Sequence, residues 1–245
     1  MNKVIAECWE WLSHQFYITF VKENRYKLFT DGIKNTVVIA VCALVIGLIL
    51  GTIVAVIRVY HAQNRNEGTK PKLWLKLLDR LCGAYLAVFR GVPVVVQLLI
   101  MYYIILSSVK AGLVVAIITF GINSGAYVAE IVRAGIMSVD KGQMEAGRSL
   151  GLSKNKTMLH VILPQAFKNI LPALGNEAIT LFKETSVAGY VTIQDVTKAG
   201  EKVRIASLEP YFSLFFVAIV YFVIVMILTR LLQLLERRLA RSDRS

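Results

Sequence analysis

The sequence predicts an all-α polytopic membrane protein, and two observations carry this prediction. Of the 245 residues, 56% are hydrophobic and only 18% are charged, which is too apolar for an ordinary soluble domain. Uncharged runs also recur along the chain, and the longest, from Val37 to Ile57, holds 21 residues. Because about 20 apolar residues are enough for a helix to cross a bilayer, we expect residues 1–245 to form a single transmembrane domain.

The segment before the first span, residues 1–33, predicts an amphipathic helix. Apolar residues between Trp9 and Phe20 recur at spacings of three and four, which places them on one helical face. Such a helix could lie on the outer surface of the membrane or pack against the bundle. Asp31-Gly32 is expected to end it before the first span begins.

Five transmembrane helices are expected within residues 34–238. Their approximate bounds are 34–60, 81–108, 110–138, 163–191 and 211–235. The fourth is the least apolar, because it contains Lys168, Glu177, Lys183 and Glu184. Residues 239–245 complete the chain as a basic tail.

The distribution of basic residues predicts the orientation of these helices. The net charge is +12, and the cytoplasmic loops of polytopic proteins carry an excess of Lys and Arg. Six basic residues lie in 58–80, six in 133–168 and five in 230–244, whereas the three in 186–210 are balanced by three acidic residues. Five crossings with this alternation place the N-terminus outside and the C-terminus in the cytoplasm. The basic excess therefore indicates membrane topology and not nucleic-acid binding.

The cytoplasmic loop over residues 139–164 is the most informative part of the chain. Asp140 begins a polar run rich in good helix formers, and Gly151 ends it at a position suited to a left-handed cap. Ser153 can cap a second short helix, after which Pro164 disturbs the regular backbone. Two short helices at an angle would form a rigid projection on which another protein docks.

This loop resembles the signature loop of importer-type ABC transporter permeases. The family pattern is Glu-Ala-Ala, three residues, Gly, nine residues, Ile, one residue and Leu-Pro. At the same spacing this chain has Glu145-Ala146-Gly147, Gly151, Val161 and Leu163-Pro164. The two departures, Gly147 for alanine and Val161 for isoleucine, keep the small and the β-branched character.

Other segments resemble the polar amino acid branch of that family. They are residues 88–93 with Gln97, 124–133, 171–177 and 183–186, so the resemblance covers about residues 26–238. It implies the type I ABC importer permease fold and the transport of amino acids by alternating access. It also implies a place in the cytoplasmic membrane of a bacterium.

The resemblance further implies partners. In the family, the loop sits in a groove of a cytoplasmic ATPase subunit, which would bind the ATP and Mg²⁺. This chain has no G-x-x-x-x-G-K-[ST] loop, so we expect it to bind no cofactor and to be no enzyme. A second permease chain, identical or similar, and an external substrate-binding protein would complete the importer. The residues expected to couple the bundle to the ATPase are Asp140, Gln143, Glu145, Ala146, Gly147, Leu150, Gly151 and Pro164.

Polar residues at bilayer depth are candidates for the transport pathway, since such groups are costly in lipid. Those near the middle of their spans, where transporters place substrate sites, are Gln97, Asn123, Tyr127, Asn176, Glu177 and Thr180. Hydrogen bonding between helices is the alternative for each of them. Arg90 and Glu130 fall at a similar depth near the cytoplasmic side, and we expect them to pair, either as a gate or as a permanent buried ion pair.

Other function classes have weaker support in the sequence. Cys8, Cys42 and Cys82 are odd in number and lack the spacing of metal ligands, so we expect no metal site. The three histidines form no H-E-x-x-H motif, which argues against an intramembrane enzyme. The remaining alternatives are a permease for another small organic solute and a gated channel whose flux needs no ATP.

Overall fold

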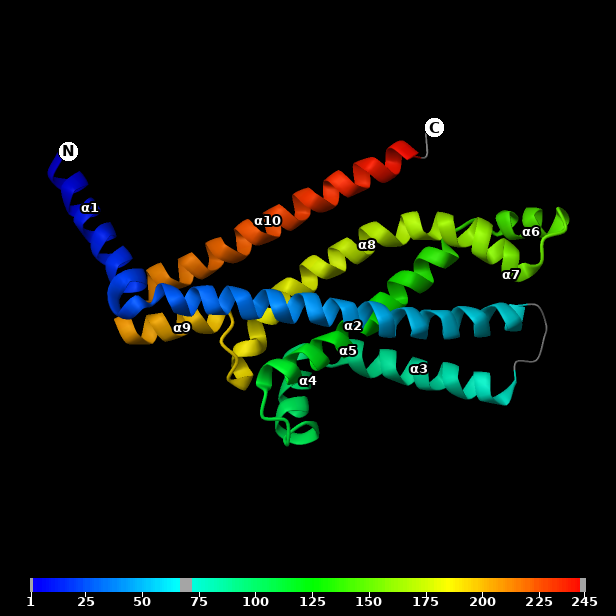
Figure 1. The fold of residues 1–245 in the computed structure, drawn as a ribbon, viewed down its shortest axis with the longest axis horizontal. Helices are drawn as coiled ribbons and strands as arrows, with labels where there is room; N and C mark the ends of the chain where they lie inside the picture. Colours follow the sequence, from blue (N-terminus) through cyan, green and yellow to red (C-terminus); the bar gives the residue numbers. More distant parts are fainter. Residues whose placement is uncertain (1, 67–71, 243–245) are drawn as a thin grey trace.

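The computed structural model describes residues 2–66 and 72–242, and these ranges contain helices and turns but no strand (Figure 1). The all-α class is therefore confirmed. In chain order the helices are α1 (Asn2–Phe16), α2 (Tyr26–Asn66), α3 (Leu73–Gly91), α4 (Val94–Ile100), α5 (Gly112–Met137), α6 (Lys141–Ser149), α7 (Lys154–Thr157), α8 (Leu163–Glu184), α9 (Val196–Ser207) and α10 (Pro210–Ser242). Shorter π-helical or 3-10 turns lie at Tyr17–Val21, Lys22–Asn24, Met101–Ile105, Met158–Ile162 and Thr185–Val191.

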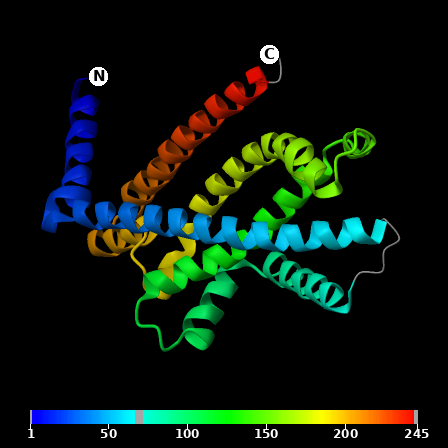
Figure 2. The same ribbon diagram turned by 45° about the vertical axis from the view of Figure 1, so that its right-hand side comes forward.

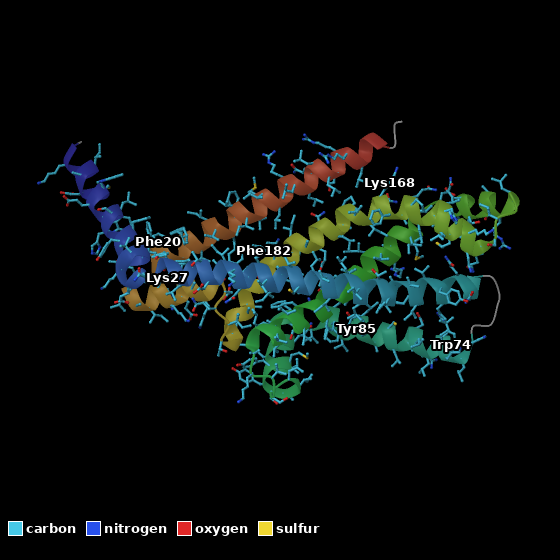
Figure 3. All side chains as sticks on the ribbon, viewed as in Figure 1. Phe20, Lys27, Trp74, Tyr85, Lys168 and Phe182 are labelled. Carbon is cyan, nitrogen blue, oxygen red and sulfur yellow. The ribbon has the colours of Figure 1, made fainter. Side chains whose placement is uncertain are left out.

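The long helix α2 forms the spine of the molecule (Figures 1 and 2). α1 and α9 lie at the N-terminal end of α2, whereas α6 and α7 lie towards its opposite end. α10 begins beside α9 and diverges from the bundle as it runs towards the C-terminus. Figure 3 places Phe20 and Lys27 near the first end and Trp74 and Lys168 towards the second.

α2 and α5 approach closely through small residues. A β-carbon built at Gly51 would lie 2.6 Å from the β-carbon of Val128, and one built at Gly121 would lie 2.8 Å from that of Ile46. Lipid tails are as apolar as leucine, so helices in a bilayer associate through close packing and not through the hydrophobic effect. The glycines therefore allow the contact that holds α5 against α2.

α5 is the most enclosed of the long apolar helices. In its most apolar stretch 61% of the residues are buried, against 28% for α2 and 11% for α10. A small residue also allows α5 to pack closely against α8, because a β-carbon at Gly135 would overlap the side chain of Ile170. α5 is thus the centre of the bundle, and α10 leaves most of its apolar surface uncovered by this chain.

The N-terminal helical segment ends earlier than predicted. The chain turns at Glu23 and Asn24, which both have φ 56°, and α2 then runs unbroken through Asp31-Gly32. The prediction that Asp31-Gly32 breaks the helix is therefore wrong, and the expected boundary after residue 33 falls inside α2. Gly32 allows close packing instead, since a β-carbon there would lie 2.7 Å from the carbonyl oxygen of Asp195.

The second predicted span, residues 81–108, is not one straight helix. α3 ends at Gly91, α4 begins at Val94, and the two are bent by 108°. Pro93 lies at the break, and its ring nitrogen has no hydrogen to continue the helical hydrogen bonds. We call residues 91–94 the elbow.

The structure supports the predicted number of crossings in part. Within the described ranges, α2, α5 and α10 are long and apolar enough to cross a membrane, and the bent pair of α3 and α4 would make a fourth crossing. α8 covers most of the predicted span 163–191, but four of its residues are charged. By length and composition the described ranges thus hold three to four candidate spans, and five crossings stay a prediction. The basic tail expected from residue 239 likewise begins inside α10.

Asp195 holds together the end of the molecule at which α9 lies. This side chain is fully buried, and its carboxylate caps α9 by accepting hydrogen bonds of 3.0 Å from the backbone N–H groups of Thr197 and Lys198. The hydroxyl of Tyr221 on α10 donates to the same carboxylate at 3.5 Å. Burial raises the pKa of the Asp195 carboxyl. One side chain therefore connects the start of α9 with α10.

We expect Gly51→Ala to lower the free energy of unfolding by about 1–3 kcal/mol, because overpacking forces neighbouring side chains or backbone to move. Gly83→Ala is the matched control, since a β-carbon at Gly83 meets no atom within 4 Å. Thermal unfolding of the purified protein in detergent measures both variants. Equal melting temperatures would contradict the close contact between α2 and α5.

Candidate functional site

The loop that joins α5 to α8 begins with a short helix, as predicted. Asp140 precedes α6, and its carboxylate accepts a hydrogen bond of 2.6 Å from the N–H of Gly142. At the other end, Gly151 has φ +83°, the left-handed conformation that glycine adopts without strain. The N–H of Leu152 donates to a carbonyl of α6 at 3.1 Å and closes the helix end. The predicted start of this helix at Asp140 and the left-handed cap at Gly151 are confirmed.

α6 and α7 are in direct contact. A β-carbon at Gly147 would overlap the methyl group of Thr157, and both residues are buried. Ser153 caps α7 by accepting a hydrogen bond of 3.4 Å from the N–H of Lys156. Because only the smallest residue fits at position 147, the two short helices form one rigid unit.

The rigid unit continues directly into α8. α7 passes through the π-helical turn Met158–Ile162 and reaches α8 without leaving the helical conformation. Pro164 lies in the first turn of α8, and the irregular backbone expected near it is this π-helical turn. The loop and α8 are therefore one continuous helical path.

The surface of the loop presents exposed side chains. Seven of the eight predicted docking residues are exposed, and Gly147 is the buried one. The exposed seven are Asp140, Gln143, Glu145, Ala146, Leu150, Gly151 and Pro164. Leu150 is 83% exposed and Leu159 is 59% exposed, so apolar side chains stand uncovered beside the charged ones. Exposed apolar groups with polar neighbours are typical of protein interaction surfaces.

A cavity of about 290 Å³ separates the loop from the ends of α2 and α5. Three methionines line it, Met137, Met144 and Met158, together with Val59 and Ile162. Unbranched methionine side chains repack readily. Part of the contact between the loop and the bundle is therefore made by side chains that can repack.

Three further cavities open along the bundle, and Arg90 lines all of them. The first, of about 580 Å³, is also lined by Arg58, Glu130 and Arg133. The second, of about 610 Å³, includes Tyr127, Glu130 and Glu177. The third, of about 330 Å³, includes Asn123, Tyr127 and Glu184. Charges of both signs thus meet around Arg90.

Glu130 is paired, but not with Arg90. Its carboxylate accepts hydrogen bonds from Arg133 at 2.8 Å and from Arg58 at 3.1 Å. The guanidinium of Arg90 lies 5.7 Å from the ring centre of Tyr127, over its face. Among the described residues the expected direct pair is therefore not formed, because two other arginines already occupy the Glu130 carboxylate.

Sequence reasoning missed the wider ion network at this site. The Nε atom of Arg58 also lies 3.6 Å from Oδ1 of Asp79, and Nδ1 of His61 lies 3.3 Å from Oδ2 of the same carboxylate. The network connects α2, α3 and α5. From the sequence we assign no functional role to residues 58–80. The available signal is Arg58, which directly follows the uncharged run, where a charge needs a partner.

The predicted mid-span residues fall into two groups. Asn123 and Tyr127 line the cavities, and Glu177 lines one of them while accepting a hydrogen bond of 2.8 Å from the hydroxyl of Ser124. Asn176 and Thr180 are exposed on α8 and line none of these three cavities. Gln97 is buried beside the elbow, where its amide bonds to backbone carbonyls. The three cavities are thus lined by three of the six predicted residues, Asn123, Tyr127 and Glu177.

Comparison with known proteins assigns the family. Residues 73–241 match the family described as binding-protein-dependent transport system inner membrane component. The chain belongs to this permease family. The predicted resemblance is confirmed.

Curated relatives of the permease cover most of its length. It is 36% identical over 216 residues to the arginine transport system permease protein ArtQ of Bacillus subtilis (strain 168). This alignment covers 87% of this chain and 93% of ArtQ. It is 31% identical over 224 residues to the L-cystine transport system permease protein TcyB of the same organism, with 90% of each chain covered.

Solved structures agree with the fold of the permease. A crystal structure of an amino acid ABC transporter with histidines matches with a TM-score of 0.78 and 34% identity, over 89% of this chain and 98% of that chain. An inward-facing structure of the MetNI methionine ABC transporter matches with a TM-score of 0.70 and 20% identity, over 86% and 96% of the two chains. The type I ABC importer permease fold is therefore confirmed.

We expect Glu130→Gln to destabilise the permease by about 1–2 kcal/mol, because Arg58 and Arg133 lose their shared counter-charge and the pairs are only partly buried. The double variant with Arg133→Gln should cost less than the sum of the two single variants. Thermal unfolding measures the cycle, with Arg80→Gln at an exposed position of α3 as control. Strictly additive losses would contradict the pair.

Proposed function

We propose that this permease is the membrane-spanning subunit of an ATP-driven importer of amino acids and that it works by alternating access. The observation that carries the proposal is the rigid pair of α6 and α7, which continues through α8 towards the polar cavities around Arg90. The relatives that are named for arginine and cystine transport support an amino acid as cargo, as does the solved transporter with histidines.

The cavities also suit an amino acid chemically. Arg90 offers a guanidinium, whose fork of N–H donors matches a carboxylate. Glu177 and Glu184 offer acceptors for an ammonium group or a cationic side chain, and Asn123 and Tyr127 offer hydrogen bonds. We propose these residues as the pathway. Asn176 and Thr180 would reach it only where a second permease chain faces their side of α8.

The partners follow from the family and from the loop. We propose that the exposed residues of α6 and the adjoining turn, with Leu150 foremost, dock into a separate ATPase subunit that binds ATP and Mg²⁺. Gly147, Gly151 and Pro164 would shape this surface without contacting the ATPase through side chains of their own. A second permease chain and an external substrate-binding protein complete the importer.

We propose a single transmembrane domain with five crossings, the N-terminus outside and the C-terminus in the cytoplasm. The basic segment 133–168, which includes α6 and α7, lies towards the same end of the bundle as the end of α2 and the start of α3 (Figure 1). The balanced segment around α9 lies at the other end. This separation supports a cytoplasmic loop end and an outer α9 end, in a bacterial cytoplasmic membrane.

Arg90 and Glu130 are proposed as parts of a cytoplasmic gate. Glu130 is held by Arg58 and Arg133 from two helices, whereas Arg90, among the described residues, makes a looser contact with an aromatic ring. Arg90 could exchange that ring for a carboxylate when the helices rearrange, at little electrostatic cost. The gate would then open by a change of partners between arginines.

Competition uptake tests the cargo. We expect membrane vesicles that contain the full importer to accumulate a radiolabelled amino acid only with ATP, and an excess of unlabelled competing amino acids to reduce this uptake. Uptake that continues without ATP would identify a channel. Competition by another class of organic solute alone would exclude amino acids as cargo.

Gly151→Val tests the coupling. A β-branched residue is strained at φ +83°, so the turn after α6 should change its path. We expect uptake to fall by about tenfold or more while the protein still inserts into the membrane and the ATPase still hydrolyses ATP. Gly83→Val, at a position with open space around it, is the control. Normal uptake by Gly151→Val would contradict a coupling role for this turn.

A further inference from the structure

The elbow between α3 and α4 is held from inside by the side chain of Gln97. This residue is 5% exposed, and its amide nitrogen donates to the carbonyl oxygen of Phe89 at 3.0 Å and to that of Val92 at 2.7 Å. The two carbonyls stand on either side of Arg90 and Gly91 in the chain. One side chain on α4 therefore fixes the backbone on both sides of Arg90.

The carbonyl of Phe89 needs this donor because of Pro93. In a continuous helix the carbonyl of residue 89 would accept a hydrogen bond from the N–H of residue 93, and proline has none. The N–H of Val92 already bonds to the preceding carbonyl, that of Val88, at 3.1 Å. Unpaired backbone groups at membrane depth are costly. The amide of Gln97 thus replaces the missing N–H of the proline.

The orientation of the Gln97 amide is fixed by its two acceptors. A flipped amide would direct its oxygen towards two carbonyl oxygens, which repel it. In the described part of the chain the Gln97 oxygen is buried and has no hydrogen-bond partner. The side chain thus leaves its own acceptor unpaired while both of its amide hydrogens are used, which indicates that the two bonds to the elbow decide its position.

We propose that Gln97 is a positioning residue, which fixes the elbow so that Arg90 points into the cavities and which does not itself touch the cargo. Arg90 lines all three cavities of the proposed pathway, and Gln97 lines none of them. This inference rests on the proposed function for its effect on transport, but the elbow itself is a structural property. It replaces the expectation that Gln97 belongs to the substrate pathway.

Two kinds of measurement separate a positioning role from a substrate contact. A residue that touches the cargo changes which amino acids are preferred. A residue that only holds the elbow changes the rate of transport for every cargo alike, and it changes the angle between α3 and α4 even without cargo. The geometry of the elbow and the order of preference must therefore be measured on the same variants.

The elbow is measured with spin labels in the full importer. Labels at Ala84→Cys on α3 and Ile104→Cys beyond α4, both exposed positions, report the distance across the elbow once the native cysteines are replaced by serine. We expect Gln97→Leu to broaden the distance distribution and to lower the maximal uptake rate by about tenfold, the factor that corresponds to about 1.4 kcal/mol. The order of preference among competing amino acids should not change. Val96→Leu, on the same helix and 39% exposed, should leave all three quantities unchanged.

A second variant keeps the test valid if Gln97→Leu fails to insert. Gln97→Met has a similar length but offers no hydrogen-bond donor, so it should broaden the distances in the same way. An unchanged distance distribution in the inserted variant would overturn the proposal, and so would a changed order of preference among cargoes. If the unmodified importer takes up no amino acid at all, the proposed function fails, while the distances still decide whether Gln97 holds the elbow.

Discussion

The close approach of α5 to α2 is the contact on which the rest of this structure depends. A bilayer offers no hydrophobic force between helices, so α5 can be held only where the two backbones nearly touch, at Gly51 and Gly121. α5 also carries Asn123, Tyr127 and Glu130. A shift of one residue in this packing would turn these side chains by about 100° around the helix axis, away from Arg90 and Arg58. The packing of small residues therefore determines which polar groups meet.

The polar groups of the bundle follow a second constraint, that donors and acceptors in lipid must find partners inside the protein. Arg58 at the end of an uncharged run finds Glu130 and Asp79, and the carbonyl broken away by Pro93 finds Gln97. The first solution joins helices that are distant in the sequence, and the second joins the consecutive helices α3 and α4. Polar side chains that are bound less tightly, such as Arg90, line the cavities.

The features predicted correctly from the sequence are those whose causes are local. Asp140 and Gly151 cap α6 because of their own side-chain and backbone preferences. The spacing of the loop residues around them can be recognised from the sequence alone. The contact of Glu130 with Arg58 was not predictable, since Arg58 lies 72 residues away and several arginines compete for one carboxylate, whereas Arg133 is only three residues away. Gly32 was misread as a break because its role depends on Asp195, on a distant part of the chain. The sequence shows Pro93, but the bend that this proline permits is held by the amide of Gln97, four residues further on. From the sequence alone, we expect Gln97 in the transport pathway.

The unbroken helical path from Lys154 to Glu184 has a mechanical consequence. At about 1.5 Å per residue it is a lever about 45 Å long along its axis, and a tilt of about 5° about its middle moves the far end by about 2 Å. Its base rests on methionines, which yield, whereas its middle is packed against α5, which does not. A stroke at the base would therefore reach the far end at about equal size and in the opposite direction, about a fixed fulcrum. The stiffness of this lever, more than the strength of docking, would set how much of the stroke arrives beside Glu177 and Glu184.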